Sequence, residues 1–277
     1  MTSLTSATGK ARNRDRVLAI ARRDLAIELS YPAALAALAG ALASLVATFF
    51  FIGRIVDPSK LGEYGGRYFE FVLLGLLVNS LATVGLGSFS KTIASEQTSG
   101  TLEVLLATPM SLPVFFLGSL IVPLGFVACE TVLVLFIAIV FLGADFQLGG
   151  IATAALAVPP ILAFYSAAGA ASAAFLVLSK RGDPFTPLAT RLTNFLAGSL
   201  FPVAVLPGVL RAVAKALPPY HALVVLRSGM LRGEGIGAVG ANYLYLCVAA
   251  AACLPLSLWL IARALRTART TGTLGNY

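Results

Sequence analysis

The stretch SEQTSGTLEVLLATP, residues 95–109, is a polar insert between two long apolar segments of the chain. Ser99 or Gly100 can begin a short helix, and Pro109 limits its extension. One face of that helix carries three leucines, Leu102, Leu105 and Leu106. The insert therefore predicts a short amphipathic helix that lies at a membrane surface and joins two membrane-spanning segments.

The composition agrees with a membrane protein. Of 277 residues, 58% are hydrophobic and only 12% are charged, whereas soluble domains carry roughly 25% charged residues. Apolar segments of about 20 residues cross the hydrocarbon core as helices, because lipid cannot satisfy unpaired backbone groups. Six segments qualify: 33–56, 68–90, 113–142, 151–178, 188–206 and 239–262. The predicted fold class is an all-α, multi-pass membrane protein with six transmembrane helices.

The basic residues predict the orientation of these spans. With the N-terminus on the cytoplasmic side, thirteen lysines and arginines lie inside and seven lie outside. This asymmetry favours cytoplasmic termini in a cell membrane, either a plasma or an inner membrane. The net charge of +8 is explained by this placement and by contact with lipid headgroups, so no nucleic-acid partner is expected. The cysteines at 129, 247 and 253 lie within spans and indicate no redox compartment.

Two motifs resemble one family. The pattern Glu-x-x-x-Gly-Thr-Leu-Glu-x-Leu-Leu-x-Thr-Pro, from Glu96 to Pro109, resembles the first cytoplasmic loop of type-2 ATP-binding-cassette (ABC-2 type) permeases, which are mostly drug or lipid exporters. The resemblance implies that this loop forms a coupling helix, which sits in a groove of the ATPase. The residues it assigns to ATPase coupling are Glu96, Gly100, Thr101, Leu102, Glu103, Leu105 and Leu106.

The second motif lies before the last span. The segment from Phe201 to Arg227 is too interrupted by proline to span, yet too apolar for an ordinary loop. Such backbone is tolerated at membrane depth only where it is buried in protein or lines a cavity. The segment is similar to the short re-entrant helices that ABC-2 type permeases fold on the outer side. The residues that carry this similarity are Phe201, Pro202, Pro207, Pro218 and Arg227.

The chain has no nucleotide site of its own. It contains no G-x-x-x-x-G-K-[ST] loop, and Gly87-Ser-Phe-Ser-Lys-Thr92 lacks the glycine before the lysine. No catalytic or metal-ligating residues are expected, since His221 is the only histidine and no G-x-S-x-G element occurs. We therefore expect no cofactor bound by this chain. ATP and magnesium would belong to separate nucleotide-binding ATPase subunits, and a second permease chain, identical or homologous, would complete the pathway.

Three polar residues within spans are candidates for the substrate pathway: Asn79, Glu130 and Asn194. A charge in lipid is costly and usually faces protein or water. Glu130 could contact a cationic substrate or take up a proton, and a hydrogen bond to a neighbouring helix explains it equally well. The two asparagines favour interhelical hydrogen bonds. The resemblance implies a pathway lined by the second and fifth spans. An ion-coupled transporter or channel, or a permease-like subunit for cofactor export or assembly, remain the alternative functions.

The chain divides into three parts. Residues 1–30 form a cytoplasmic tail and an N-terminal interfacial helix, because apolar and basic residues alternate from Lys10 to Leu29. A charged extension of the first span is the alternative there. Residues 31–263 form the transmembrane domain, with a coupling loop at 91–112 and the outer re-entrant segment at 201–230. Residues 264–277 form a cytoplasmic tail. Gly85, Gly87, Gly169 and Ala170 predict close helix contacts.

Overall fold

The chain folds as a bundle of long helices. The computed structural model describes residues 17–56, 67–98, 112–179 and 185–270, and no β-strand occurs within these ranges. Five of the described helices are long and apolar enough to cross a membrane: α2 (Pro32–Ile55), α3 (Tyr68–Thr98), α5 (Leu112–Val140), α6 (Ile151–Ser179) and α10 (Ile236–Thr270). The prediction of an all-α, multi-pass membrane protein is confirmed.

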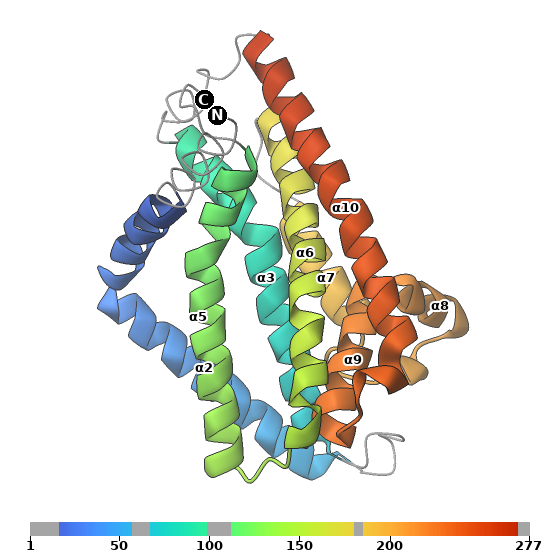
Figure 1. Ribbon diagram of the computed structural model, residues 1–277. Helices are drawn as coiled ribbons and strands as arrows, with labels where there is room; N and C mark the ends of the chain where they lie inside the picture. The colour runs from blue at the N-terminus through green and yellow to red at the C-terminus, as the bar shows by residue number, and fades with distance from the viewer. Residues whose placement is uncertain (1–16, 57–66, 99–111, 180–184, 271–277) are drawn as a thin grey trace, which may run out of the picture.

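The long helices alternate in direction. α3, α6 and α10 finish at one end of the bundle, here the upper end, and α2 and α5 finish at the opposite, lower end (Figure 1). Between α6 and α10 the chain returns to the lower end through shorter elements: α7 (Phe185–Leu196), η3 (Val203–Val205), α8 (Gly208–Ala216) and α9 (Pro218–Arg232). Six passages along the bundle result, of which the fifth is made of broken helices.

The fifth passage differs from the continuous span expected over 188–206. α7 has 12 residues, or about 18 Å of helix, which is less than the roughly 30 Å of a hydrocarbon core. Gly198 then adopts a φ of 78°, a left-handed conformation that glycine tolerates without strain. α8 and α9 follow at an angle of 81° to each other. The expected series of short helices before the last span is therefore present.

α3 is the central helix of the bundle. In its membrane-spanning window 72% of the residues are buried, against 6% in α2. α6 packs against α3 on one side and against α10 on the other. At the crossing of α3 and α6, a Cβ atom on Gly85 would lie 2.5 Å from the Cβ of Tyr165, and one on Gly169 would lie 2.5 Å from the carbonyl oxygen of Leu86. Only glycine permits this approach.

Of the other two small residues, one behaves as expected and one does not. Ala170 is fully buried, as a close helix contact requires. A Cβ on Gly87 would meet the side chain of Lys91, on its own helix, at 3.3 Å. Gly87 therefore makes room for a neighbouring lysine and not for another helix.

The N-terminal segment enters the bundle through a sharp bend. Residues 17–29 are helical, Tyr31 has a non-helical backbone with a ψ of 67°, and Pro32 is the first residue of α2. Proline disfavours helical backbone at the residue before it, which explains the break. Ile20 fixes the first helix against α5, where its side chain packs on Gly118. The helix and the bend are as expected, and the position of the helix in the headgroup plane stays a prediction.

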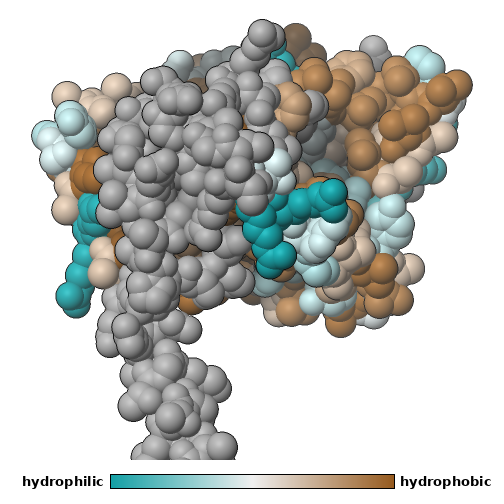
Figure 2. All heavy atoms as spheres, turned by 90° about the horizontal axis from the view of Figure 1, so that it is seen from above, coloured by the Kyte–Doolittle hydropathy of each residue, from teal (hydrophilic) through white to brown (hydrophobic). Residues whose placement is uncertain are grey.

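The lateral surface is suited to lipid. Large apolar side chains of α10 are exposed, among them Leu244, Val248, Leu256 and Trp259. Seen from the upper end, hydrophobic residues cover much of the flank on the right of the view (Figure 2). α10 continues to Thr270, so the first residues of the part assigned to the C-terminal tail extend the last helix.

Candidate functional site

The predicted coupling segment begins at the upper end of the bundle. α3 continues to Thr98, so the first eight residues of the expected 91–112 loop are helical, and α5 begins at Leu112 beside it (Figure 1). Glu96 lies in the last turn of α3, and its side chain is outside the described part. The other coupling candidates, from Gly100 to Leu106, lie outside the described residues. Their role in ATPase coupling stays a prediction.

Glu130, the candidate acid within a span, joins two helices. The hydroxyl of Ser80 in α3 donates to Glu130 Oε1 in α5 at 3.0 Å, and both side chains are half-buried. This is the interhelical hydrogen bond that was one of the two interpretations of Glu130. Such a bond satisfies a carboxylate that would otherwise be costly in lipid. The alternative, contact with a substrate or a proton, stays a prediction.

The two asparagines lie on different helices. Asn79 directly precedes Ser80 in α3, so Asn79 and Glu130 lie at one level of the bundle. The side chain of Asn79 is half-buried, and the backbone carbonyl oxygen of Asn79 accepts a hydrogen bond from the hydroxyl of Thr83 at 3.0 Å. Asn194 lies in α7, which packs against α3, and its side chain is outside the described part.

The prolines of the predicted re-entrant segment begin its helices. Pro202 precedes η3 and Pro207 precedes α8, both with extended backbone, while Pro218 is the buried first residue of α9. Proline suits these positions because a helix start leaves its N–H groups unbonded. The ring of Phe201 packs edge-to-face on Phe195 of α7, with the ring centroids 5.6 Å apart. The sequence thus dictates where each short helix begins.

Arg227 holds this segment to the centre of the bundle. Its side chain lies in α9 and is only 4% exposed. The guanidinium donates to the carbonyl oxygens of Gly198 at 2.9 Å and Ser199 at 3.0 Å, just beyond the end of α7. It also donates to the carbonyl oxygen of Phe71 in α3 at 3.1 Å. The backbone of Ser199 lies directly against Gly75, where no side chain would fit. One arginine therefore satisfies the irregular backbone between α7 and η3.

Comparison with known protein families identifies this architecture. The sequence profile described as ABC-2 type transporter matches residues 25–231. The chain belongs to the ABC-2 type transporter family. The match extends from the N-terminal helix through α9, and so includes every candidate residue named above. Comparison with curated proteins gives no match.

Family membership states the general role of the chain. An ABC-2 type membrane domain is the permease component of an ABC transporter, a transport subunit that is generally not itself catalytic. It implies partnership with ATP-binding subunits. With the helices described above, the chain is a multi-pass membrane protein of a transporter.

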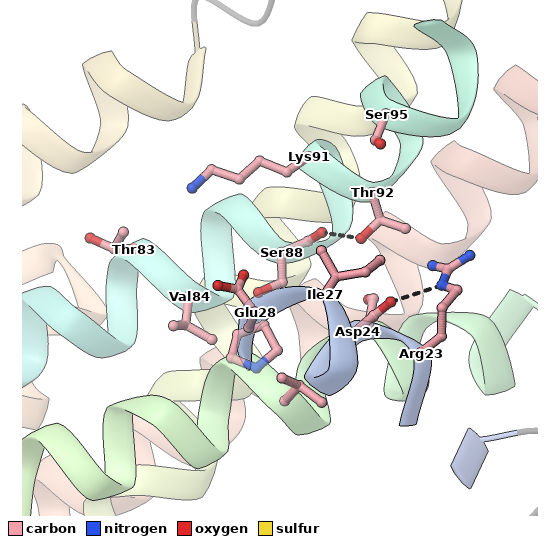
Figure 3. A pocket seen from close by; sticks show the side chains of 13 residues that line it. Arg23, Asp24, Ile27, Glu28, Thr83, Val84, Ser88, Lys91, Thr92 and Ser95 are labelled. Carbon is pink, nitrogen blue, oxygen red and sulfur yellow. Dashed lines mark hydrogen bonds and ion pairs between the residues drawn. The ribbon is translucent and has the colours of Figure 1, made fainter. Parts of the chain in front are cut away.

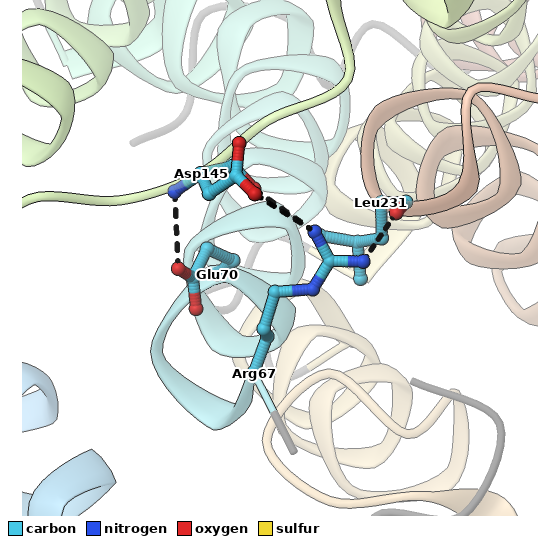
Figure 4. Close-up of polar contacts among 4 residues, drawn as sticks. All are labelled: Arg67, Glu70, Asp145 and Leu231. Atoms are coloured by element: carbon cyan, nitrogen blue, oxygen red, sulfur yellow. Dashed lines mark hydrogen bonds and ion pairs between the residues drawn. The ribbon is translucent and has the colours of Figure 1, made fainter. Parts of the chain in front are cut away.

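A second polar network at the lower end of this permease was missed by the sequence analysis. Arg67, just before α3, forms an ion pair of 3.7 Å with Asp145 and donates to the carbonyl oxygen of Leu231 in α9 at 2.5 Å (Figure 4). Glu70 accepts a hydrogen bond of 3.2 Å from the backbone N–H of Asp145. The network joins α3, the connection between α5 and α6, and the end of α9. The only feature of the sequence that could have indicated this network is the presence of opposite charges at the ends of neighbouring spans.

His221 is also fixed by contacts on both sides of its ring. Nδ1 lies 2.8 Å from the side-chain oxygen of Asn242 in α10, and Nε2 lies 2.9 Å from the carbonyl oxygen of Lys215 in α8. The ring stacks on Tyr245, with a centroid distance of 4.1 Å. The only histidine of the permease thus ties α8, α9 and α10 together, as a structural residue does.

Proposed function

We propose that this permease is the membrane subunit of an ATP-driven exporter, in which two such chains form the pathway between them. The two chains are identical or homologous. Separate ATPase subunits bind ATP and magnesium and dock at the upper end of the bundle, on the coupling segment. Membership of the ABC-2 type transporter family supports the proposal that ATP-binding subunits are partners of this chain.

The observation that carries the mechanism is the continuity of α3. The helix has 31 residues, or about 46 Å at 1.5 Å per residue, and it is the most buried of the five long helices. Its upper end runs directly into the proposed coupling segment after Thr98. Its lower half accepts a hydrogen bond from Arg227 and packs against the turn after α7. A displacement imposed at the upper end therefore moves the lower, re-entrant segment with it.

Transport then follows from two arrangements of the paired chains. ATP binding brings the docked subunits together and favours one arrangement, and hydrolysis releases it. A ligand shifts such an equilibrium only by its differential affinity for the two states. The excess of basic residues at the upper end supports its placement in the cytoplasm. Substrate would enter from there or from the adjacent leaflet.

The test is to purify the tagged protein from its native membrane, identify co-purifying chains by mass spectrometry, and assay ATP hydrolysis. We expect a cassette ATPase at a stoichiometric level. Glu96→Ala and Leu105→Arg should reduce its recovery or uncouple hydrolysis from transport, because they alter the proposed docking residues. Lys215→Ala, an exposed cation in α8, is the matched control and should leave both unchanged.

The opposite result would favour ion-coupled transport. If the protein is recovered without an ATPase and still moves solutes along an ion gradient, the exporter proposal fails. Glu130 would then be the first residue to test. Recovery of the ATPase together with a cofactor-handling assembly, but without any transport in reconstituted vesicles, would instead support the assembly-subunit alternative.

A further inference from the structure

A polar cavity lies at the upper end of the bundle, beside the last turns of α3, which include the first residues of the expected 91–112 loop. It has a volume of about 610 Å³, is open on one side, and is lined by the helix over residues 17–29, α3 and α5 (Figure 3). The last turns of α3 form one wall, and the N-terminal helix forms another. This volume falls within the roughly 300–1,000 Å³ of small-molecule sites. Nothing described so far assigns it a role.

One wall of the cavity carries two adjacent donors for an anion. Lys91 lies along α3, where its Cε is 3.3 Å from the position of a Cβ on Gly87. Ser88, three residues earlier, lines the cavity on the same side of α3. Within the described residues neither the Lys91 amine nor the Ser88 hydroxyl has a hydrogen-bond partner. An ammonium and a hydroxyl on one wall can both donate hydrogen bonds to the oxygens of a phosphate group.

The facing wall carries the opposite charge. Glu28 projects from the N-terminal helix toward Ser88 (Figure 3), and it has no ion-pair partner within the described part of the chain. Next to it, Arg23 Nε and the carboxylate of Asp24 form an ion pair of 2.9 Å. The charges that line the cavity therefore balance, with Lys91 and Glu28 available for a ligand that has both signs.

The deeper side of the cavity is more apolar. Val84 of α3 and Val122 and Pro123 of α5 line it, beside Thr83, whose hydroxyl donates to the backbone carbonyl oxygen of Asn79. Val84 lies about two turns below Lys91 along α3, toward the middle of the membrane span. The gradient from charged to apolar lining matches an amphiphile whose headgroup lies at the upper end and whose chains point into the bilayer.

We propose that this cavity binds the headgroup of a zwitterionic aminophospholipid of the phosphoethanolamine type. Lys91 and Ser88 bind its phosphate, and Glu28 binds its primary ammonium. An anionic phospholipid without an amine would leave the Glu28 carboxylate facing a phosphate. A choline headgroup has no N–H to donate to Glu28, so it forms a weaker contact. The inference concerns lipid binding by this chain alone and does not depend on the proposed ATPase coupling.

The test uses the full-length protein without ATP or ATPase. It is reconstituted in vesicles of equal parts phosphatidylethanolamine, phosphatidylglycerol and phosphatidylcholine with matched acyl chains, then extracted in mild detergent. Bound lipids are counted by native mass spectrometry. We expect phosphatidylethanolamine to be retained about tenfold over either other lipid, as one charge-assisted contact supplies. Lys91→Met, which keeps the stem over Gly87, and Glu28→Gln should each abolish that preference.

Two comparisons make the outcome decisive. Lys215→Met removes an exposed cation elsewhere and should leave retention unchanged. Ser88→Ala is a small change that should reduce retention of phosphatidylethanolamine about threefold. It replaces Lys91→Met or Glu28→Gln as the test variant if either of these elutes as an aggregate. Equal retention of the three lipids would overturn the proposal. Preferential retention of phosphatidylglycerol that survives Glu28→Gln would also overturn it, because the site would then be one for an anionic headgroup.

Discussion

The guanidinium carbon of Arg227 lies 3.3 Å from the ring centroid of Phe71, and the same side chain donates to the Phe71 carbonyl oxygen. The two residues are 156 positions apart and belong to α9 and α3. The contact combines a cation–π interaction with hydrogen bonds to two further carbonyl oxygens, of Gly198 and Ser199. It therefore makes the broken fifth passage part of the central core.

Replacing Arg227 by methionine should destabilise the permease by about 3 kcal/mol, because buried carbonyl oxygens lose their donors. Arg227→Lys should recover only part of this, since an ammonium lacks the planar fork. The melting temperatures of the purified variants in one detergent measure both changes in stability. Lys215→Ala, on the exposed surface of α8, is the control. Equal melting temperatures for Arg227→Met and the native protein would show that the Arg227 contacts do not hold α9 to the central core.

The contacts of Arg227 also explain why hydropathy predicted the bounds of five spans well but predicted a continuous helix for the fifth passage, which is broken. The segment 188–206 is apolar enough to predict a continuous helix, but α7 ends at Leu196. The helix can stop there because Arg227, far along the chain, supplies donors to Gly198 and Ser199. A window of local sequence contains no such partner. The prolines, by contrast, act locally, and they predicted the broken helices correctly.

The crossing of α3 and α6 should not tolerate any larger residue. Gly169→Ala places a Cβ about 2.5 Å from two carbonyl oxygens of α3, and overpacking of this kind costs about 1–3 kcal/mol or more. We expect lower yield and a lower melting temperature. Gly125→Ala in α5 is the matched control, because a Cβ there meets no atom within 4 Å. If the two variants have the same yield and melting temperature, α3 and α6 do not approach each other as closely as described.

The Ser80 and Glu130 pair should behave as one structural unit. Glu130→Gln keeps an acceptor for the Ser80 hydroxyl, so we expect ATP-driven transport to be preserved. Glu130→Leu and Ser80→Ala should each destabilise the protein by about 1 kcal/mol, and the double variant should cost less than their sum. The melting temperatures of the native protein, the two single variants and the double variant form a double-mutant cycle that tests this. Loss of transport in Glu130→Gln with unchanged stability would instead indicate a proton or substrate role.

The candidate site was only partly accessible to sequence reasoning. Glu130 is conspicuous because an acid within a span is rare, whereas its donor Ser80 is one of many hydroxyl residues and gives no signal of its own. Arg67 and Asp145 were visible as charges at span ends, but their pairing depends on how α3 and α5 meet at the lower end. Contacts between distant segments set these partners, and residue type alone does not.

The number of passages predicts where the termini lie. α6 and α10 both run toward the upper end, so the chain between them must return through α7 to α9, which makes six passages (Figure 1). An even number places both termini on one side, and the thirteen basic residues assigned to that side predict that it is the cytoplasm. Single cysteines at Ser3, Gln147 and Thr273 test this, in a background in which Cys129, Cys247 and Cys253 are serine. On intact cells a membrane-impermeant maleimide should label Gln147→Cys, which is exposed at the lower end. Ser3→Cys and Thr273→Cys should react only after the membrane is opened, and labelling of just one of these two on intact cells would mean an odd number of passages.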